Sequence, residues 1–272
     1  MDNLTPVSPD PAPPPGPGVV PATAPTPPAG GWAVAAGRGL AWWSEGWRLF
    51  KANPVIWIVI TFLFIALMFG LALIPFVGQI ASSLLYPVLG AGILLGTRAL
   101  DRGGELTVGH LFACFNDKAM PLIVVALLYF GGWFVIWMVG LALLIGLAGF
   151  QTLSALMSGD PVETGLTLIA AIGFAIVIVV LVMTLLAVPL IMAYWFAPAL
   201  VLFRGDEPMA AMKSSFTAGM RNIPPFLVYS LLGMVFAIVA SIPLFLGWIV
   251  LAPVYAATIY ASYKDIFGVP AA

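Results

Sequence analysis

Charged side chains are scarce in this sequence of 272 residues, which holds 10 Lys and Arg, 11 Asp and Glu, and a net charge of −1. Charged residues make up 8% of the chain and hydrophobic residues 62%, and the mean hydropathy is +1.11. An ordinary soluble domain has roughly a quarter charged residues. A water-soluble surface therefore cannot be built from this composition. The near-neutral balance gives no indication of nucleic-acid binding.

Cysteine and histidine are as scarce, because Cys114 and His110 are the only ones. This excludes a disulfide framework, a Cys/His zinc site and an iron–sulfur cluster built by one chain. The two residues are four apart, a spacing that places them on one helix face. Two ligands without a carboxylate make a poor metal site, however, and Thr107–His110 is typical of a helix start. We expect no metal and no cofactor.

No Walker loop, dinucleotide-binding fingerprint or metalloprotease motif occurs. Nor does any nucleophile stand beside a general base. We therefore expect that the protein is not an enzyme, with no catalytic residues.

Long hydrophobic runs are abundant instead, and each is long enough to cross the hydrocarbon core of about 30 Å. A transmembrane barrel would need alternating polar residues, and these runs do not alternate. The sequence predicts an all-α membrane protein with six transmembrane helices near residues 54–74, 79–98, 121–150, 166–203, 223–242 and 245–263.

The cations fix the predicted orientation. All ten lie on one side of the six spans, at Arg38, Arg48, Lys51, Arg98, Arg102, Lys118, Arg204, Lys213, Arg221 and Lys264. The opposite side offers only Gln79, Gln151, Asp160 and Glu163 as strongly polar groups. By the positive-inside rule, both termini are predicted to be cytoplasmic.

Residues 1–31 form a predicted tail ahead of a membrane domain over 32–272. The tail holds 11 of the 24 prolines and no aromatic residue, so it cannot bury enough apolar surface to order itself. We interpret it as a disordered, solvated spacer, although its Pro-x-x-Pro spacings could dock in an aromatic groove of a partner.

A threefold internal repeat is predicted. Lys51, Lys118 and Arg221 each lie three residues before a proline that opens an odd-numbered span, at Pro54, Pro121 and Pro224. Proline suits the first helical turn, and the cation outside it anchors the helix at the headgroups. Each unit would be a helical hairpin preceded by a short interfacial amphipathic helix, such as the one that carries Trp43, Trp47 and Phe50, the one with Leu111, Phe112 and Phe115, and the one with Met209, Met212, Phe216 and Met220.

The even-numbered spans carry a proline near mid-span, which predicts kinks at Pro87, Pro189 and Pro253. Small residues four apart follow each proline and would allow close helix packing in lipid: Gly92/Gly96, Ala193/Ala197 and Ala257/Ala261. Because Gly and Ala are common in this chain, such pairs would also arise often by chance.

Seven cations are predicted to be interfacial anchors that contact phospholipid headgroups: Arg48, Lys51, Arg98, Lys118, Arg204, Arg221 and Lys264. Sequence neighbours suggest the ion pairs Arg98/Asp101, Arg204/Asp206 and Lys264/Asp265.

The third and fourth spans are longer than the roughly 20 residues that a membrane requires. Strong tilt, a break near Pro198, or protrusion would absorb the excess, and we favour tilt with a break. Protrusion would need cover from a protein partner or a second copy of the chain.

Several motifs carry a resemblance to a known family: Gly46–Phe50 with Asn53–Pro54, Gly96–Gly103, His110–Phe112, Trp195–Leu200, Arg221–Asn222 with Pro225–Tyr229, and Ala261–Phe267. Over about 41–267 the chain resembles an uncharacterised proteobacterial family of inner-membrane proteins. More remotely, it is similar to the membrane portion of some glycerophosphodiester phosphodiesterases, without their catalytic domain. The resemblance implies the bacterial inner membrane and supplies no catalytic residues.

Two functions remain as hypotheses. The first is a non-enzymatic envelope protein that interacts with membrane phospholipids or with a protein partner, including a homo-oligomer. The second is a permease or channel for a small neutral or amphipathic solute, since three kinked helices could surround a path. No ionisable residue lies at mid-membrane depth, where ion-coupled transporters usually place one. A polar cavity lined by the kinks would favour transport, and a dry centre would oppose it.

Overall fold

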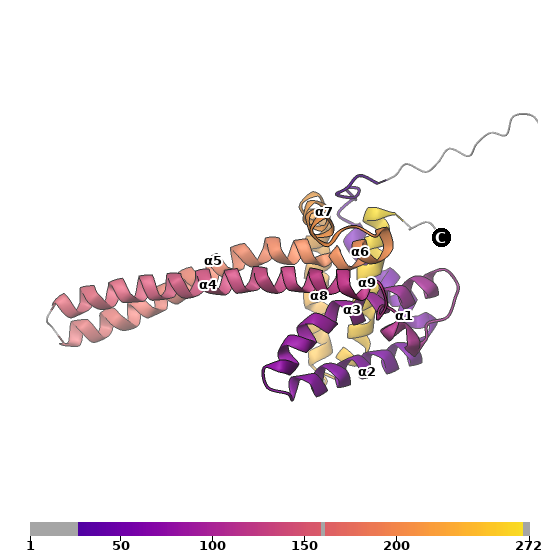
Figure 1. The fold of residues 1–272 in the computed structure, drawn as a ribbon. Helices are drawn as coiled ribbons and strands as arrows, with labels where there is room; N and C mark the ends of the chain where they lie inside the picture. Colours follow the sequence, from indigo (N-terminus) through magenta and orange to yellow (C-terminus); the bar gives the residue numbers. More distant parts are fainter. Residues whose placement is uncertain (1–26, 159–160, 269–272) are drawn as a thin grey trace, which may run out of the picture.

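The computed structural model describes residues 27–158 and 161–268, and these ranges are helical without strands, which confirms the all-α class. The elements follow one another along the chain as helices joined by short loops (Figure 1). They are α1 (Arg38–Ala52), α2 (Pro54–Ala72), α3 (Val77–Asp101), the 3-10 helix η1 (Val108–Phe112), α4 (Ala119–Ser158), α5 (Pro161–Trp195), α6 (Ala197–Arg204), α7 (Pro208–Arg221), α8 (Ile223–Ser241) and α9 (Trp248–Phe267).

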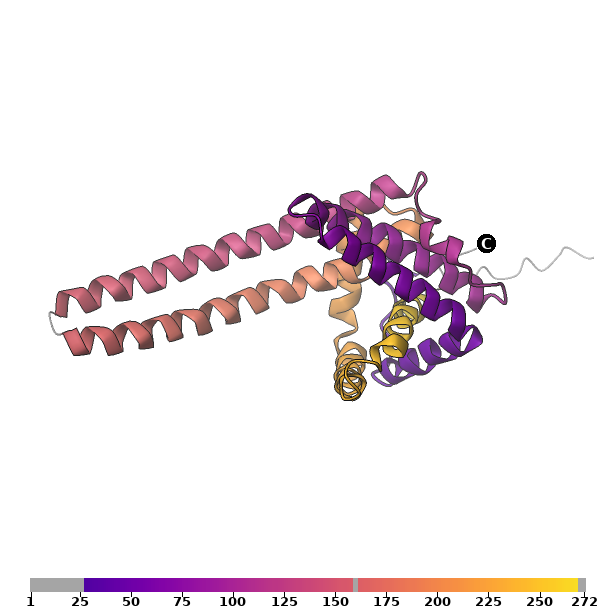
Figure 2. The same cartoon turned by 90° about the horizontal axis from the view of Figure 1, so that it is seen from below.

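Three helical hairpins diverge from one end of the molecule (Figure 1). The α2–α3 hairpin points to the lower left, α8 and α9 run from top to bottom, and the α4–α5 hairpin extends to the left far beyond both. Seen from below, α8 and α9 are viewed nearly along their axes, whereas α4 and α5 still lie across the page (Figure 2). The long hairpin therefore runs crosswise to α8 and α9.

Five helical stretches among the described residues are long and apolar enough to cross a membrane, by length and composition. They are Pro54–Ala72, Val77–Asp101, Ala119–Ser154, Ile172–Arg204 and Ile223–Ser241. The predicted sixth span corresponds to α9, which is 20 residues long but carries Lys264 in its last turn. Half of its residues are buried within the protein. A sixth crossing therefore stays a prediction.

The helix starts follow the local sequence. Asn53 caps α2, because its side chain accepts a hydrogen bond from the Ile56 amide at 3.3 Å, and Pro54 occupies the first turn. The helix start predicted at Thr107–His110 is confirmed by reciprocal capping contacts between these two residues, although it opens a 3-10 helix rather than an α-helix.

The break predicted near Pro198 is confirmed, since α5 ends at Trp195 and α6 begins at Ala197. A proline inside a helix removes one amide donor and clashes with the preceding turn. The buried Ser215 hydroxyl, from α7, bridges the opened turn: it donates to the Met192 carbonyl at 2.7 Å and accepts from the Phe196 amide at 2.9 Å. The freed backbone groups are thereby satisfied within the protein.

The α4–α5 hairpin begins with a helix longer than the predicted third span. Its first helix has 40 residues, which corresponds to about 60 Å, roughly twice the thickness of the hydrocarbon core. Apolar side chains stay exposed along its described outer part, including Leu141, Ile145, Ile176, Val177 and Val180. Such a surface needs lipid or a protein partner around it, and a hairpin of this length would fit within one bilayer only at a steep tilt.

The aromatic stripe on α1 differs from the prediction of an interfacial helix. Trp43 and Phe50 are buried, and only Trp47 is exposed. Trp43 stacks on Tyr229 of α8 with ring centroids 5.0 Å apart, and Trp42 is also buried. The stripe therefore packs into the protein core, against α8 and α9, instead of facing lipid.

The other two predicted amphipathic segments keep an exposed face. In η1 and the turn after it, Leu111 is buried while Phe112 and Phe115 are exposed. In α7, Met212 is buried and the exposed residues of the stripe are Met209, Phe216 and Met220.

Chain segments approach each other closely at several glycines. Gly92 and Gly96 were predicted as packing positions, whereas Gly46 was not. A Cβ at Gly46 would lie 2.6 Å from Thr258 Cγ2, so α1 and α9 cross there. A Cβ at Gly96 would lie 2.5 Å from Leu106 Cδ1, and one at Gly92 would overlap the His110 carbonyl. The predicted small pair on α3 thus packs against the 105–112 segment and not against a second spanning helix.

The remaining predicted kink and packing residues lie as follows. The three prolines stand inside continuous helices, and the small residues range from half-buried Ala193 to fully buried. The prolines are Pro87 in α3, Pro189 in α5 and Pro253 in α9. Among the small residues, Ala197, Ala257 and Ala261 are buried. Their effect on packing stays a prediction.

The end of the predicted tail is docked on the bundle. Residues 1–26 lie outside the described residues, but the backbone of Trp32 donates to the Ile266 carbonyl at 2.8 Å. The buried Asn222 side chain donates to the Trp32 carbonyl at 3.0 Å and accepts from the Val34 amide at 2.8 Å. The chain therefore enters the bundle beside the α7–α8 junction.

The packing at Gly96 gives a first prediction. Gly96→Leu should lower the yield of folded protein severalfold, because the new side chain meets Leu106 and His110 at a buried contact. Ser83→Ala should leave the yield near that of the wild type, since the Ser83 hydroxyl bonds only the Gln79 carbonyl of its own helix. Monodisperse protein recovered by gel filtration in detergent measures both. Equal yields would show that the contact tolerates bulk.

Candidate functional site

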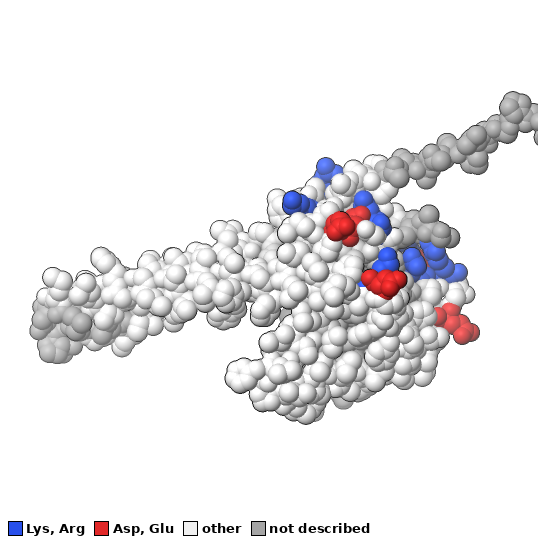
Figure 3. Space-filling model, viewed as in Figure 1, with Lys and Arg blue, Asp and Glu red and all other residues white. Residues whose placement is uncertain are grey.

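Charged side chains gather at the end of the molecule from which the hairpins diverge, and we call this region the charged end (Figure 3). The visible surfaces of the hairpins are white in this view, meaning that neither Lys, Arg, Asp nor Glu covers them. This separation matches a bundle whose hairpins enter the hydrocarbon while one end stays in water.

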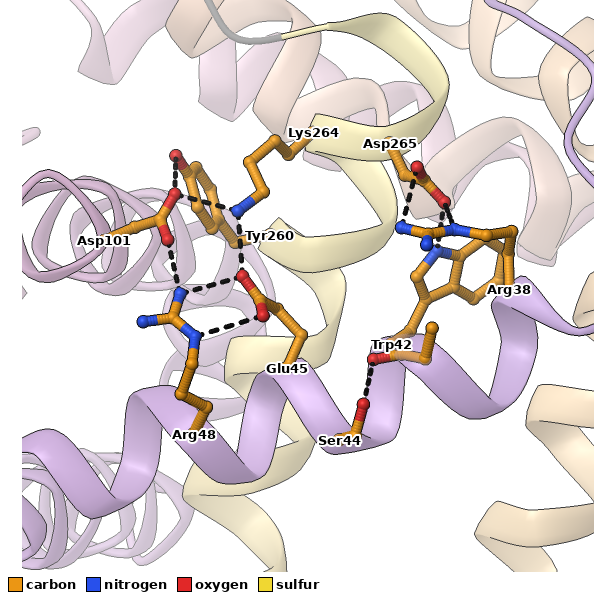
Figure 4. A network of polar contacts seen from close by, with 10 residues as sticks. Arg38, Trp42, Ser44, Glu45, Arg48, Asp101, Tyr260, Lys264 and Asp265 are labelled. Atoms are coloured by element: carbon orange, nitrogen blue, oxygen red, sulfur yellow. Dashed lines mark hydrogen bonds and ion pairs between the residues drawn. The ribbon is translucent and has the colours of Figure 1, made fainter.

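A ring of four alternating charges joins three helices at this end (Figure 4). Arg48 Nη2 lies 2.8 Å from Glu45 Oε1 and 2.6 Å from Asp101 Oδ1. Lys264 Nζ closes the ring at 2.8 Å from Glu45 Oε1 and 3.0 Å from Asp101 Oδ2. We call Glu45, Arg48, Asp101 and Lys264 the charge ring. It ties α1 to the last turns of α3 and α9.

The environment of the ring stabilises its charged state. Hydrogen bonds from Arg48, with further help from Lys264, lower the pKa of Glu45 to about 2 against the opposing effect of burial. Burial alone would lower the pKa of Lys264, but the carboxylates of Glu45 and Asp101 raise it. With both cations and both carboxylates charged, the ring is neutral overall and its members compensate one another.

A second ion pair fixes the start of α1. Arg38 donates two hydrogen bonds to the Asp265 carboxylate, from Nε to Oδ2 at 2.6 Å and from Nη2 to Oδ1 at 2.9 Å (Figure 4). The Trp42 indole also donates to Oδ2, at 2.9 Å. This bidentate geometry is the strong form of an arginine–carboxylate contact. Together with the charge ring, it holds α1 along the charged half of α9.

Two of the three ion pairs expected from sequence neighbours are wrong. Lys264 pairs with Glu45 and Asp101 instead of Asp265, and Asp265 pairs with Arg38. Asp101 pairs with the ring cations, while Arg98 lies over the Phe203 ring at 4.7 Å. Adjacent helix positions do not face each other, which explains the Lys264/Asp265 error.

The third expected pair is present. Arg204 Nε lies 3.6 Å from Asp206 Oδ1, and the Arg204 guanidinium also lies over the Phe267 ring. Arg221 Nη1 donates to the Gly31 carbonyl at 3.3 Å. Lys51 and Lys118 are exposed at the end of α1 and just before α4. Contacts of these anchors with lipid headgroups stay a prediction.

A groove lies between the α2–α3 and α4–α5 hairpins. Its large lobe has a volume of about 920 Å³ and reaches from Gln79, Ser82 and Ser83 to Trp137. Its small lobe has about 440 Å³ and extends past Pro87 to α9. Both lobes are lined by the same four aromatic residues: Phe64, Tyr86, Tyr129 and Tyr194. We call these four the waist of the groove.

The aromatic rings of the waist pack against one another in pairs, and three of them carry hydroxyl groups. Tyr129 and Tyr194 stack with ring centroids 4.2 Å apart, and Phe64 meets Tyr86 edge-on at 5.6 Å. None of the hydrogen bonds described for residues 27–158 and 161–268 involves the hydroxyls of Tyr86, Tyr129 or Tyr194. Among the described residues, none that lines either lobe carries a charge. The groove therefore suits an uncharged, largely apolar molecule with a few oxygen atoms.

Trp195 borders the small lobe beside the waist. Its Nε1 is buried and, within the described part of the chain, has no hydrogen-bond partner. The indole meets Phe226, Tyr229 and Tyr255 in edge-on contacts at 5.8 to 6.1 Å.

His110 and Cys114 serve local structure. His110 Nδ1 contacts the Thr107 hydroxyl at 2.9 Å and accepts from the Thr107 amide at 3.1 Å. Cys114 is fully buried, and burial raises the pKa of its thiol to about 11. Within the residues that the structure describes, no three His, Cys, Asp or Glu side chains cluster as metal ligands would.

The waist tyrosines were missed from sequence, although a signal existed. Tyr129 lies ten residues after the start of α4, and Tyr194 lies ten residues before the end of α6. Membrane proteins concentrate tyrosine at the headgroup level. A tyrosine well inside an apolar span is therefore a marker of a polar or aromatic interior site. The roles of Glu45 and Ser215 had no such marker, because their partners lie far away in sequence.

The charge ring predicts a pH dependence. Because the folded pKa of Glu45 lies below its usual value of about 4.3, its ion pairs stabilise the fold above that pH. This contribution is lost as pH falls toward 2. Glu45→Gln should lower the free energy of unfolding at pH 7 by about 1–2 kcal/mol, given its partial exposure.

Thermal unfolding in detergent, followed by tryptophan fluorescence between pH 7 and pH 2.5, measures the effect. The difference between wild type and Glu45→Gln should shrink as the pH falls through that window. Glu105→Gln, at an exposed carboxylate, serves as the control. A difference that stays constant with pH would contradict a role for the Glu45 charge.

Comparison with known proteins points to the bacterial inner membrane. The chain is 27% identical over 254 residues to a probable inner membrane protein of Burkholderia thailandensis, an alignment that covers 87% of this chain and 93% of that protein. No family model matches the chain, and no solved structure matches it. The similarity and the long apolar helices together indicate a multi-pass inner membrane protein.

Proposed function

We propose that this multi-pass inner membrane protein is a non-enzymatic lipid-binding protein that holds membrane lipid in the groove between the α2–α3 and α4–α5 hairpins. One observation carries the proposal: an uncharged groove, with lobes of about 920 and 440 Å³, opens between helices that are apolar enough to cross the membrane. A groove at this place is in contact with hydrocarbon, so lipid chains are its natural occupants.

The depth of the groove supports this proposal. The waist residues Tyr129 and Tyr194 each lie ten residues from a helix end at the charged end, which is about 15 Å along a helix. Because the α4–α5 hairpin is tilted, this distance is an upper bound on the depth, and Tyr86 of the waist gives a better measure: it lies nine residues after the start of α3 and twelve before Arg98, near the middle of that span. The waist is thus close to mid-membrane, where water and polar solutes are scarce.

The proposal includes a topology. We propose that α9 is a sixth span, that each hairpin with its preceding short helix is one unit of a threefold repeat, and that both termini are cytoplasmic. The gathering of cations at one end supports this orientation. The opposite loop near 151–164 has polar residues, including Asp160, that lie outside the described residues.

Cysteine labelling tests the topology. Cys114 is buried and its thiol pKa is raised, so an introduced cysteine can be labelled selectively. A membrane-impermeant maleimide applied to spheroplasts should label Met157→Cys, at an exposed position in the last turn of α4, opposite the charged end. Lys213→Cys, on α7, should react only after the membrane is permeabilised. The reverse pattern would overturn the orientation.

Retained lipid tests the groove. The wild-type chain, purified in mild detergent, should retain at least one lipid per molecule, measured by mass spectrometry after extraction. Gly90→Leu should lower the retained lipid at least threefold, because Gly90 lines the small lobe and its Cβ position is in open space.

Gly131→Leu is the matched control, since Gly131 also has open space around it but lies outside both lobes. It should retain as much lipid as the wild type. Equal retention by Gly90→Leu would contradict lipid binding in the groove.

The second candidate is a permease for an amphipathic solute. Its support is that Pro87 and Pro198, near the kink of α3 and the break between α5 and α6, both line the small lobe. The lining is aromatic and aliphatic, however, unlike the polar path that a water-soluble solute needs. The remote resemblance to the membrane portion of glycerophosphodiester phosphodiesterases, and a protein partner or second copy on the exposed α4–α5 hairpin, stay hypotheses.

A further inference from the structure

We propose that the ligand of the groove is a neutral lipid with two hydrocarbon chains joined through ester or ether oxygens, the class to which diacylglycerol belongs. This inference rests on the proposed function, because it names the kind of lipid that the groove selects. Three features of the groove support it: its two lobes, its polar waist, and the depth of that waist.

The shape of the groove matches two chains. The described linings of the two lobes share only the four waist residues: beyond them, residues of α2, α3 and α4 line the large lobe, and residues of α2, α3, α5, α6 and α9 line the small one. A lipid whose two chains diverge from one junction fills both lobes, with its junction at the waist.

The chemistry of the waist matches the junction of such a lipid. Tyr86, Tyr129 and Tyr194 present hydroxyl groups without a described protein partner, and each hydroxyl can donate one hydrogen bond. Ester and ether oxygens are acceptors without a charge. A polar group that stays unbonded in a low-dielectric interior costs free energy, so the three hydroxyls favour a ligand with acceptors at this place.

The depth of the waist excludes a charged head beside it. Tyr86 lies nine residues from the outer end of α3 and fifteen from Asp101, which is about 14 Å and 22 Å along the helix. A phosphate so far from water would need a cation, and no charged residue lines the groove. In an ordinary phospholipid the charged head holds the ester oxygens near the interface. Only an uncharged lipid can bring them to mid-membrane.

A competition experiment tests the selectivity. The full chain in detergent is incubated with equal amounts of dioleoylglycerol, dioleoylphosphatidylglycerol and dioleoylphosphatidylethanolamine, separated by gel filtration, and analysed by mass spectrometry for bound lipid. We expect dioleoylglycerol to be enriched about tenfold over either phospholipid.

Variants that remove only hydroxyl groups locate the selectivity. The triple variant Tyr86→Phe, Tyr129→Phe and Tyr194→Phe keeps every ring and should lose most of the enrichment, at least fivefold. The single variant Tyr129→Phe should lose part of it and guards against misfolding of the triple variant. Tyr263→Phe is the control, because Tyr263 is buried against Phe203 and Phe267 and lines neither lobe.

The outcomes separate this inference from the proposed function. Retention of all three lipids in proportion to the mixture, lowered by Gly90→Leu, would overturn the neutral-lipid inference and leave lipid binding in place. Unchanged enrichment in the tyrosine variants would also overturn the inference, since the waist would not contact the lipid junction. Retention that Gly90→Leu does not alter would overturn both.

Discussion

The charge ring at one end of the bundle is the interaction that fixes the α2–α3 and α8–α9 hairpins to α1. Glu45 and Arg48 come from α1, Asp101 from the last turn of α3, and Lys264 from the last turn of α9. Each charge has an opposite charge within about 3 Å on another helix or another turn. Apolar helices have little to hold them together in lipid besides packing and polar contacts. The ring provides such contacts at the end where water also supports them.

Hairpins joined at one end are free to diverge at the other, and the groove follows from this divergence. The α4–α5 hairpin is far longer than the α2–α3 hairpin and runs crosswise to α8 and α9 (Figures 1 and 2). The break at Phe196, bridged by Ser215, turns the chain from the long hairpin into the short helix α6 beside the core. The wedge that remains between the hairpins is lined by aromatic rings.

Much of the architecture was accessible from sequence because it depends on local rules. Apolar run length predicted the helical spans, and Pro198 predicted the break before α6. The hydroxyls of Ser83 and Ser241 follow a local rule as well, since each donates to a backbone carbonyl four residues earlier in its own helix. The predicted partner of Lys264 was wrong, and no partner was specified for Gly96. In both cases the partner depends on which segment of the chain lies opposite. That information is tertiary, and residue spacing does not contain it.

The same distinction bears on the two functional hypotheses. The lack of charged residues in the predicted spans argues against ion-coupled transport. It does not indicate which polar groups the interior of the bundle holds instead. The structure brings Tyr86, Tyr129 and Tyr194 together from three helices, at a depth where hydroxyl groups need a partner. A polar solute would need a continuous polar path to reach them, whereas a lipid reaches them through hydrocarbon alone. The position of the hydroxyls therefore favours lipid as the ligand over a water-soluble substrate.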